Sequence, residues 1–364
     1  LRGAESSIFS AVVAAYMDVI RDESIVELNR ANVGVLQVNL EATRDRFEIG
    51  DLTRTDVAQS EARLAIATSD LETARASLIR SKEFYIQLVG HEPGKLEAPP
   101  PLPNLPQSPD SAVGVALEYN PDLIAAKEQR EAAQFDRRAA NASRLPQIAA
   151  VGGSTHSNNL GSIDTTLPYD RWSNSAQIGV QATIPLYQGG AGSARIRQAQ
   201  AFLGQAQELE IAAERDVIAQ TRAAYASWQA SEEVITASER AVSANELSLE
   251  GVRAENSVGN RTILDILNAE QELVNSRVLL VTARRNAYVA GFSLLAAMGK
   301  AEARDLGLDG GPLYDPIAEY KSVEGEWTDW NDRPDPTTQA TRTVDTPAQK
   351  ADIEPLPDYT GRKQ

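Results

Sequence analysis

The 364-residue sequence contains no cysteine and only two histidines, His91 and His156. Without cysteine the chain cannot form a disulfide framework, a zinc ribbon, an iron–sulfur cluster or a catalytic thiolate. The two histidines lie far apart in the sequence and lack the spacing of a helical metal site. The glycines at 189, 190 and 192 lack the Lys-Ser or Lys-Thr pair of a phosphate loop. We therefore expect no enzyme activity, no metal and no other cofactor.

Basic residues and long apolar runs are also scarce. The 35 lysines and arginines face 51 acidic residues, which gives a net charge of −16. This balance argues against nucleic-acid binding, which needs clustered positive charge. The longest uninterrupted apolar run, residues 11–17, is shorter than the roughly 20 residues of a transmembrane helix. Aromatic residues make up 5% of the chain, which is little for several compact cores.

Proline is missing from residues 1–90 and 186–311. Because proline breaks a helix interior, both stretches can form very long helices. They are rich in Ala, Glu, Gln, Arg and Leu, which favour helix. A continuous helix over residues 193–255 would be on the order of 95 Å long at 1.5 Å per residue. Alanine-rich helices of this length are typical of coiled-coil or tubular assemblies.

The sequence repeats itself at an offset of 209 positions, without a gap from about residue 8 to residue 90. The matched pairs are Tyr16 with Tyr225, Gly50 with Gly259, Thr53 with Thr262, Asp56 with Asp265, Arg75 with Arg284, and Gly90 with Gly299. The chain is therefore predicted to contain two copies of one long helical hairpin. If the repeat is complete, about a hundred residues with a first-copy strand hairpin precede Leu1.

Each copy carries the same turn at its tip. Gly50 and Gly259 suit the left-handed residue that commonly ends a helix. The Thr-x-x-Asp sequences that begin at Thr53 and Thr262 match a capping box, which opens the next helix. Two long helices are thus predicted to meet at a tight turn in each copy.

Asp56 and Asp265 close these capping boxes, and capping explains both without any further function. A second interpretation follows if several copies form a tube, because each tip residue then becomes a ring. An acidic ring at a constriction selects for cations. Arg261 would then be placed to bridge to Asp56 of a neighbouring hairpin and hold the constriction shut. The sequence leaves both interpretations open.

Strict alternation of apolar and polar residues predicts a strand over residues 172–186. Its length exceeds the roughly 9–11 residues that cross a membrane in a tilted barrel strand. A weaker partner strand is predicted over residues 146–158, and residues 159–171 are predicted to form an exposed loop. A soluble strand hairpin packed on a helix is the alternative interpretation.

Together these features resemble the TolC-like outer-membrane efflux and secretion channels. The resemblance covers about residues 5–305 and rests on the repeated hairpin, the strand, VGNRTILDILNA at 258–269 and IPLYQGG at 184–190. It implies a mainly α fold with a small β part, in which long antiparallel helical hairpins form an α-barrel tunnel. It also implies a homotrimer whose protomers share a twelve-stranded transmembrane β-barrel.

The resemblance further implies a place in the Gram-negative outer membrane, in contact with its lipid, with the tunnel in the periplasm. The channel would passively export drugs or other substrates as part of a tripartite pump. Its partners would be a periplasmic adaptor and an inner-membrane pump or ABC transporter. Two alternatives remain: the outer-membrane duct of a type I protein secretion system, and a soluble periplasmic coiled-coil adaptor or scaffold.

The resemblance also assigns roles to residues at the hairpin tips. The pore gate would be Asp265 with Asn268, where Asn268 stands in place of a second aspartate. The closed-state latch would comprise Arg261, Asp56, Thr55 and Asn256, where Asn256 stands in place of a tyrosine. An adaptor would dock near Gly50, Gly259, Thr53 and Thr262. A single acidic ring is expected to bind cations more weakly than two.

The whole chain is expected to divide into seven segments. They are a first helical hairpin (1–90), a proline-rich equatorial linker (91–117), a helix (118–145), a transmembrane β-hairpin (146–186), a second helical hairpin (187–300), an equatorial belt segment (301–330) and a disordered acidic tail (331–364).

Overall fold

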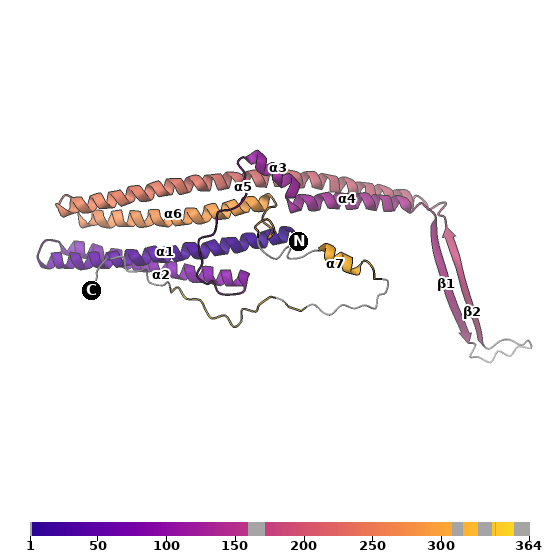
Figure 1. Ribbon diagram of the computed structural model, residues 1–364, viewed down its shortest axis with the longest axis horizontal. Helices are drawn as coiled ribbons and strands as arrows, with labels where there is room; N and C mark the ends of the chain where they lie inside the picture. The colour runs from indigo at the N-terminus through magenta and orange to yellow at the C-terminus, as the bar shows by residue number, and fades with distance from the viewer. Residues whose placement is uncertain (1, 159–171, 308–315, 327–336, 339, 353–364) are drawn as a thin grey trace, which may run out of the picture. The chain divides into compact units, whose positions relative to one another are not determined.

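A computed structural model describes residues 2–158, 172–307, 316–326, 337–338 and 340–352 (Figure 1). The chain divides into two units, residues 1–121 with 216–364, and residues 122–215. Long helices dominate both units, and one antiparallel strand pair is present among the described residues. The predicted fold class, mainly α with a small β part, is confirmed. The predicted loop 159–171 lies outside the described residues.

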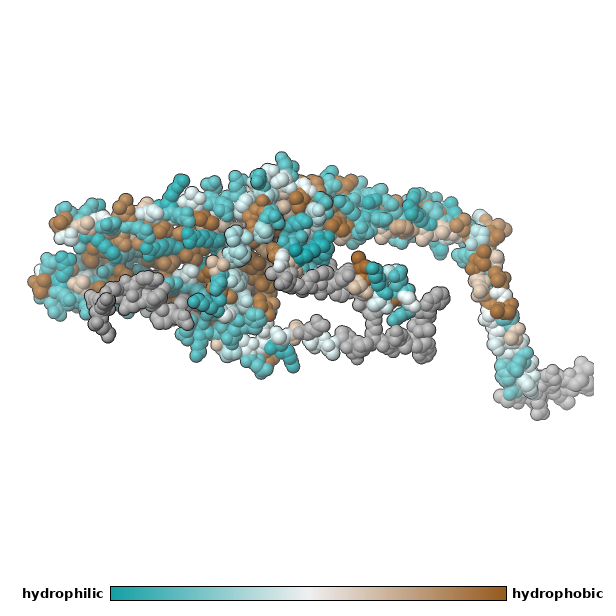
Figure 2. Space-filling model, in the orientation of Figure 1, coloured by the Kyte–Doolittle hydropathy of each residue, from teal (hydrophilic) through white to brown (hydrophobic). Residues whose placement is uncertain are grey.

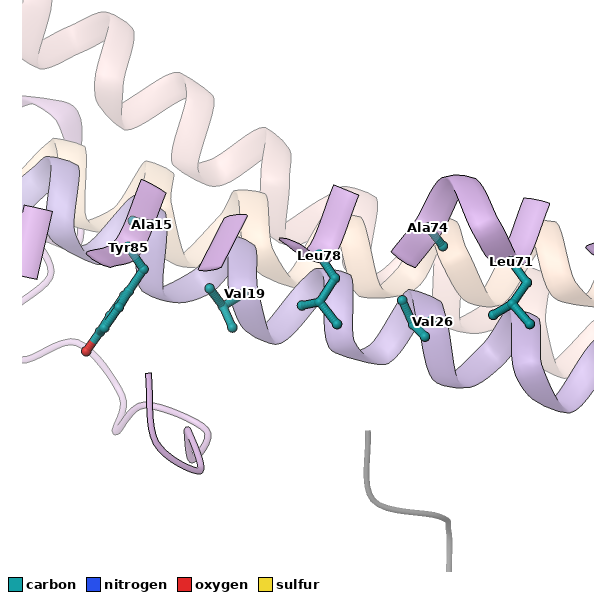
Figure 3. Packing of buried hydrophobic residues seen from close by; sticks show 7 residues of the cluster. All are labelled: Ala15, Val19, Val26, Leu71, Ala74, Leu78 and Tyr85. Atoms are coloured by element: carbon teal, nitrogen blue, oxygen red, sulfur yellow. The ribbon is translucent and has the colours of Figure 1, made fainter. Parts of the chain in front are cut away.

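The first helical hairpin consists of α1 (Arg2–Glu48) and α2 (Arg54–Val89), which run side by side (Figure 1). Apolar side chains fill the seam between them (Figure 3). The buried members are Ala15, Val19 and Val26 from α1, and Leu71, Ala74, Leu78 and Tyr85 from α2. Burial of each Val or Leu contributes about 1.5–3 kcal/mol, so this seam stabilises the hairpin.

The second helical hairpin consists of α5 (Ala191–Ser257) and α6 (Ile263–Ala297). The predicted continuous helix over 193–255 is confirmed. Leu249, Ile266 and Leu273 pack between the two helices near their tip. The backbones of α5 and α6 approach each other less closely than those of α1 and α2, and α1 also packs along α6. The two hairpins therefore meet through α1 and α6.

The internal repeat is visible in the backbone. Helix α2 begins at Arg54 and α6 begins at Ile263, and these positions are 209 residues apart. The glycines that follow the four hairpin helices adopt the same left-handed conformation. Their φ angles are 79° at Gly50, 83° at Gly259, 85° at Gly90 and 71° at Gly299.

By length and composition alone, α1 contains a window that could cross a membrane, with a mean hydropathy of 1.2. A packed helix of a soluble domain meets the same criterion. Helix α1 packs against both α2 and α6, and 22% of this window is buried.

A proline-rich linker follows α2 and leads into α3 (Pro109–Tyr119). This helix begins within the stretch predicted to be linker, because Ser108 caps it and Pro109 occupies its first turn. The hydroxyl of Tyr16 donates to the carbonyl oxygen of Glu97 at 2.6 Å, and that of Tyr225 donates to Gln107 at 3.2 Å. Equivalent tyrosines of the two repeats thus hold the same linker.

The second unit contains most of α4 (Pro121–Ala142), the strands β1 (Gln147–Asn158) and β2 (Trp172–Thr183), and the start of α5. The strands pair antiparallel from Gln147 opposite Thr183 to Asn158 opposite Trp172. Strand β2 ends before the predicted residue 186, because Pro185 has no N–H to donate to a ladder.

Every residue of β1 and β2 is exposed in the single chain. Ile148, Ile178 and Val180 share one face of the pair, as the register requires. Apolar residues gather over the half of the pair near Gln147 (Figure 2). A two-stranded sheet with an exposed apolar face is marginal alone and needs further strands or another apolar surface.

The C-terminal region contains α7 (Pro316–Val323) and the described residues 340–352. The segment 331–364 was expected to be a disordered tail. Residues 340–352 instead contact α2, for example through Thr341 and Gln349. Residues 331–336, 339 and 353–364 lie outside the described part of the chain.

Candidate channel gate at the hairpin tips

The two hairpin tips have the same backbone geometry. Gly50 N–H donates to the carbonyl oxygen of Phe47 and Asp51 N–H to that of Arg46, both at 2.9 Å. In the second tip Gly259 N–H donates to Asn256, also at 2.9 Å. A positive φ is needed at both glycines, which L side chains adopt only with strain. The predicted tip glycines are confirmed as turn residues.

Both predicted capping boxes form. Asp56 Oδ2 accepts hydrogen bonds from the backbone N–H and the hydroxyl of Thr53, at 2.9 and 2.7 Å. Asp265 Oδ2 accepts from the same two groups of Thr262, at 2.9 and 2.8 Å. The threonine hydroxyls accept in return from the backbone N–H of Asp56 and of Asp265. The capping boxes therefore fix the start of α2 at Arg54 and the start of α6 at Ile263.

These hydrogen bonds keep both tip carboxylates ionised. The side-chain and backbone hydrogen bonds from Thr53 lower the pKa of Asp56 below its ordinary value. The backbone and side-chain hydrogen bonds from Thr262, with a smaller contribution from the charge of Arg261, lower the pKa of Asp265. Both residues are half-buried in the single chain, and because their pKa values are lowered each tip carries a negative charge at neutral pH.

Asn268, the other predicted gate residue, lies on α6 and faces the first hairpin. Its Oδ1 accepts a hydrogen bond from Arg63 Nη2 of α2 at 2.6 Å. Arg63 and Asn268 thus join the two hairpins of one protomer. An amide in this position adds no charge to the tip, so the fixed negative charge of this stretch of α6 rests on Asp265.

The predicted latch residues make local contacts within one chain. Arg261 Nε donates to Glu255 Oε2 at 2.7 Å, and this pairing raises the pKa of Arg261. Asn256 Nδ2 donates to the carbonyl oxygen of Arg261 at 2.7 Å. Thr55 is exposed. The structure brings Asn256 and Arg261 together, and it does not bring either of them to Asp56 of the same chain.

A buried carboxylate above the tip was missed by the sequence analysis. Glu270 of α6 is 4% exposed and accepts from Arg253 Nη2 of α5 at 2.9 Å. The amide of Asn39 on α1 lies 3.0 and 2.9 Å from its two oxygens. Glu270 therefore ties three helices and both hairpins. The available signal was an acidic residue between Leu267 and Leu273, which are both buried.

The tips also expose apolar side chains at equivalent positions. Ile49 is 81% exposed and Val258 is 71% exposed, and each immediately precedes a tip glycine. An isolated exposed apolar residue needs no explanation, but the same exposure in both copies marks a repeated surface. No group of three or more His, Asp or Glu side chains suited to a metal occurs among the described residues.

Comparison with known proteins connects this geometry to a family. The family model for "outer membrane efflux protein" matches residues 112–300. The outer membrane efflux protein BepC of Brucella suis is 36% identical over 329 residues, which cover 90% of this chain and 70% of BepC. The chain belongs to the outer membrane efflux protein family.

Other members support this assignment. The outer membrane protein TolC of Vibrio cholerae is 29% identical over 81% of this chain and 68% of TolC. The crystal structure of VceC from Vibrio cholerae has a TM-score of 0.66 over 82% of this chain and 72% of VceC, with 23% identity. This structural likeness confirms the channel fold, with its α-barrel tunnel and β-barrel.

Membership in the outer membrane efflux protein family identifies the chain as a channel protein of the Gram-negative outer membrane. The predicted efflux function and location are confirmed, and the family consists of transport channels. The alternative of a soluble periplasmic adaptor is not supported. The exposed strands β1 and β2 fit this channel fold, in which strands form a β-barrel.

Proposed function

We propose that three copies of the chain assemble into an efflux channel whose periplasmic end is gated by the hairpin tips. In this proposal residues 1–90 and 187–300 form the tunnel wall, and residues 146–186 contribute to the barrel. Residues 91–117 and 301–330 form an equatorial belt. An inner-membrane pump or ABC transporter would drive transport through a periplasmic adaptor, and the channel itself would conduct passively.

The observation that carries the gate is the ionised carboxylate of the half-buried Asp265 at the second hairpin tip. Its capping bonds use Oδ2, so the other oxygen is available to a cation. Three copies would place three such carboxylates at one constriction, and an acidic ring attracts cations. Asn268 is neutral and hydrogen-bonded to Arg63. The negative charge of the gate would therefore come from a single ring, formed by the Asp265 carboxylates.

Asp265→Ala tests this role in the intact channel, reconstituted in planar bilayers. We expect lower cation selectivity and weaker block by multivalent cations, because the ring charge is removed. Thr262→Val is the matched control, since it weakens the same capping box but keeps the Asp265 carboxylate. Unchanged selectivity in Asp265→Ala, or an equal loss in both variants, would leave Asp265 with a capping role only.

The comparison of the repeats supports assembly from several copies. Arg44 and Glu61 form an ion pair in the first hairpin at the positions equivalent to Arg253 and Glu270. Asn39 of the adjacent hairpin covers Glu270, whereas Glu61 is exposed. A neighbouring protomer that presents its second hairpin to α2 would cover Glu61 in the same way, which a closed ring of hairpins requires.

The exposed tips provide a surface for an adaptor. Ile49 and Val258 are apolar, repeated and adjacent to Gly50 and Gly259. We expect Ile49→Ser with Val258→Ser to reduce co-purification of a periplasmic adaptor while the trimer stays heat-resistant. Identification of the native inner-membrane partner in the same experiment separates drug efflux from a type I protein secretion duct.

A further inference from the structure

The C-terminal segment 340–352 runs along the last turns of α2. The hydroxyl of Thr341 donates to the carbonyl oxygen of Gly90 at 3.1 Å. The backbone N–H of Gln349 donates to Glu83 Oε1 at 3.0 Å. Ala351 packs against the apolar cluster between α1 and α2. The segment therefore passes the end of α2 first and continues towards the middle of the helix.

The end of this segment borders a groove on α2. Gln349, Lys350, Ala351 and Asp352 line one side of a hollow of about 450 Å³. The opposite wall comprises Glu72, Arg75, Ala76 and Ile79. Glu72 and Arg75 of this wall are charged, and Ala76 and Ile79 are aliphatic.

The second hairpin has a hollow with two equivalent lining positions, and a different segment borders it. Pro101, Leu102 and Leu105 of the linker line a hollow of about 310 Å³ together with Arg284 and Tyr288 of α6. The hydroxyl of Tyr288 donates to the carbonyl oxygen of Pro100 at 3.2 Å. Arg284 and Tyr288 are the repeat equivalents of Arg75 and Ile79.

The two segments occupy different places in the repeat. The linker directly follows α2, whereas residues 340–352 lie 209 positions after residues 131–143, at the end of α4. Each lies against the outgoing helix of the other copy of the hairpin. The hydrogen bonds of Thr341 and Gln349 and the packing of Ala351 hold the C-terminal segment on α2 at three points.

We propose that residues 340–352 are a strap that holds the last turns of α2 in the first hairpin. The strap is the chain's own C-terminal segment, and it turns at residues 343–346, where the N–H of Thr346 donates to the carbonyl oxygen of Thr343 at 3.1 Å. The strap shields the last turns of α2 and supplies a hydrogen-bond donor to Gly90, the residue that ends the helix. This inference does not depend on the gate role of Asp265.

Cross-linking tests where the strap lies, and the absence of native cysteine makes labelling unambiguous. We expect Ala76→Cys with Lys350→Cys to be joined within one chain by a short bifunctional maleimide. The matched control is Arg285→Cys with Lys350→Cys, because residue 285 is the repeat equivalent of residue 76. No cross-link at 76, a cross-link between two protomers, or equal yields for both pairs would overturn the proposal.

Hydrogen exchange tests what the strap does. Deletion of residues 337–364 in the full trimer is expected to speed exchange of the amides at 76–90 about tenfold, because local opening becomes easier. The equivalent amides at 285–299 serve as the internal reference and are expected to be unchanged. Equal rates with and without the segment, or equal acceleration in both hairpins, would contradict a strap on α2.

A point variant separates the strap from a general effect of truncation. Glu83→Ala removes the acceptor of the Gln349 N–H, and we expect a smaller acceleration confined to the same stretch of α2. Asp70→Ala removes another exposed carboxylate from α2 and is expected to change nothing there. The same response to both variants would show that the Gln349 contact does not hold the segment.

Discussion

The two hairpins carry the same ion pair in different surroundings. Arg44 and Glu61 lie 2.6 Å apart, and their repeat equivalents Arg253 and Glu270 lie 2.9 Å apart. The side chain of Glu61 is 49% exposed and that of Glu270 is 4% exposed. An exposed pair contributes little to stability, whereas a buried carboxylate depends on its partners. The repeated sequence thus gives the same ion pair in both hairpins. Whether a neighbouring helix covers the pair determines how much the pair contributes to stability.

The seams of the hairpins differ as well. Leu78 is fully buried between α1 and α2, while its equivalent in the second hairpin is Ala287. Between α5 and α6, exposed ion pairs join Arg277 to Glu246 at 2.8 Å and Arg284 to Glu239 at 3.0 Å. The first hairpin is therefore closed by apolar packing, and the second is held in part by polar contacts across a wider gap.

The largest expected effect comes from removing this packing. Leu78→Ala gives the first hairpin the residue of the second and should lower the free energy of unfolding by about 3 kcal/mol, because it leaves a cavity. The control is Leu279→Ala, which truncates an exposed leucine of α6 and should cost less than about 0.5 kcal/mol. Urea unfolding followed by circular dichroism measures both, and equal losses would contradict the packed seam.

The ion pairs give the next test. Arg253→Ala leaves Glu270 buried with Asn39 as its remaining partner, and we expect a loss of about 2 kcal/mol. Arg44→Ala breaks the equivalent pair, which is exposed in the single chain, and should cost the separate protomer less than about 0.5 kcal/mol. In the trimer, where a neighbouring hairpin is proposed to cover Glu61, the loss should approach that of Arg253→Ala. Hydrogen exchange of each hairpin and urea unfolding of the trimer provide the comparison. A loss as large in Arg44→Ala would mean that assembly buries Glu61 as deeply as Glu270.

The capping boxes are the feature in which the hairpins should not differ. Thr53→Val and Thr262→Val each remove one capping oxygen, and each should cost about 1 kcal/mol. The pKa values of Asp56 and Asp265 are lowered in the folded state. Their contribution to stability is therefore present above the ordinary aspartate pKa of about 3.9 and lost as the pH falls through the lower folded value.

Acid titration of unfolding checks this sign. Between neutral pH and about pH 3, the free energy of unfolding should fall less in both valine variants than in the native chain. The reason is that their carboxylates have already lost the hydroxyl partner. A clear difference between the two variants would indicate that one tip has contacts beyond its own capping box.

The tips could be predicted because their geometry depends on neighbours in sequence. Thr53, Asp56 and Gly50 lie within seven positions, and their types alone specify a turn and a cap. The start of α3 also depends on neighbouring residues, because Ser108 caps the helix and Pro109 opens it. The other prolines nearby led to the prediction of a linker in this stretch. The burial of Glu270 could not be predicted, because Asn39 lies 231 positions away. The contacts of Thr341 and Gln349 with α2 are equally remote in sequence.

The linker between the hairpins has a consequence for how this chain can change in evolution. Tyr16, Tyr288 and Tyr225 donate in turn to the carbonyl oxygens of Glu97, Pro100 and Gln107. A proline-rich segment is stiff, at about 3.1 Å per residue. The distance between these three hydrogen bonds is therefore set by the number of residues between them. Most surface loops tolerate insertions. A single residue added between 97 and 100 would shift the carbonyl oxygens of Pro100 and Gln107 away from Tyr288 and Tyr225.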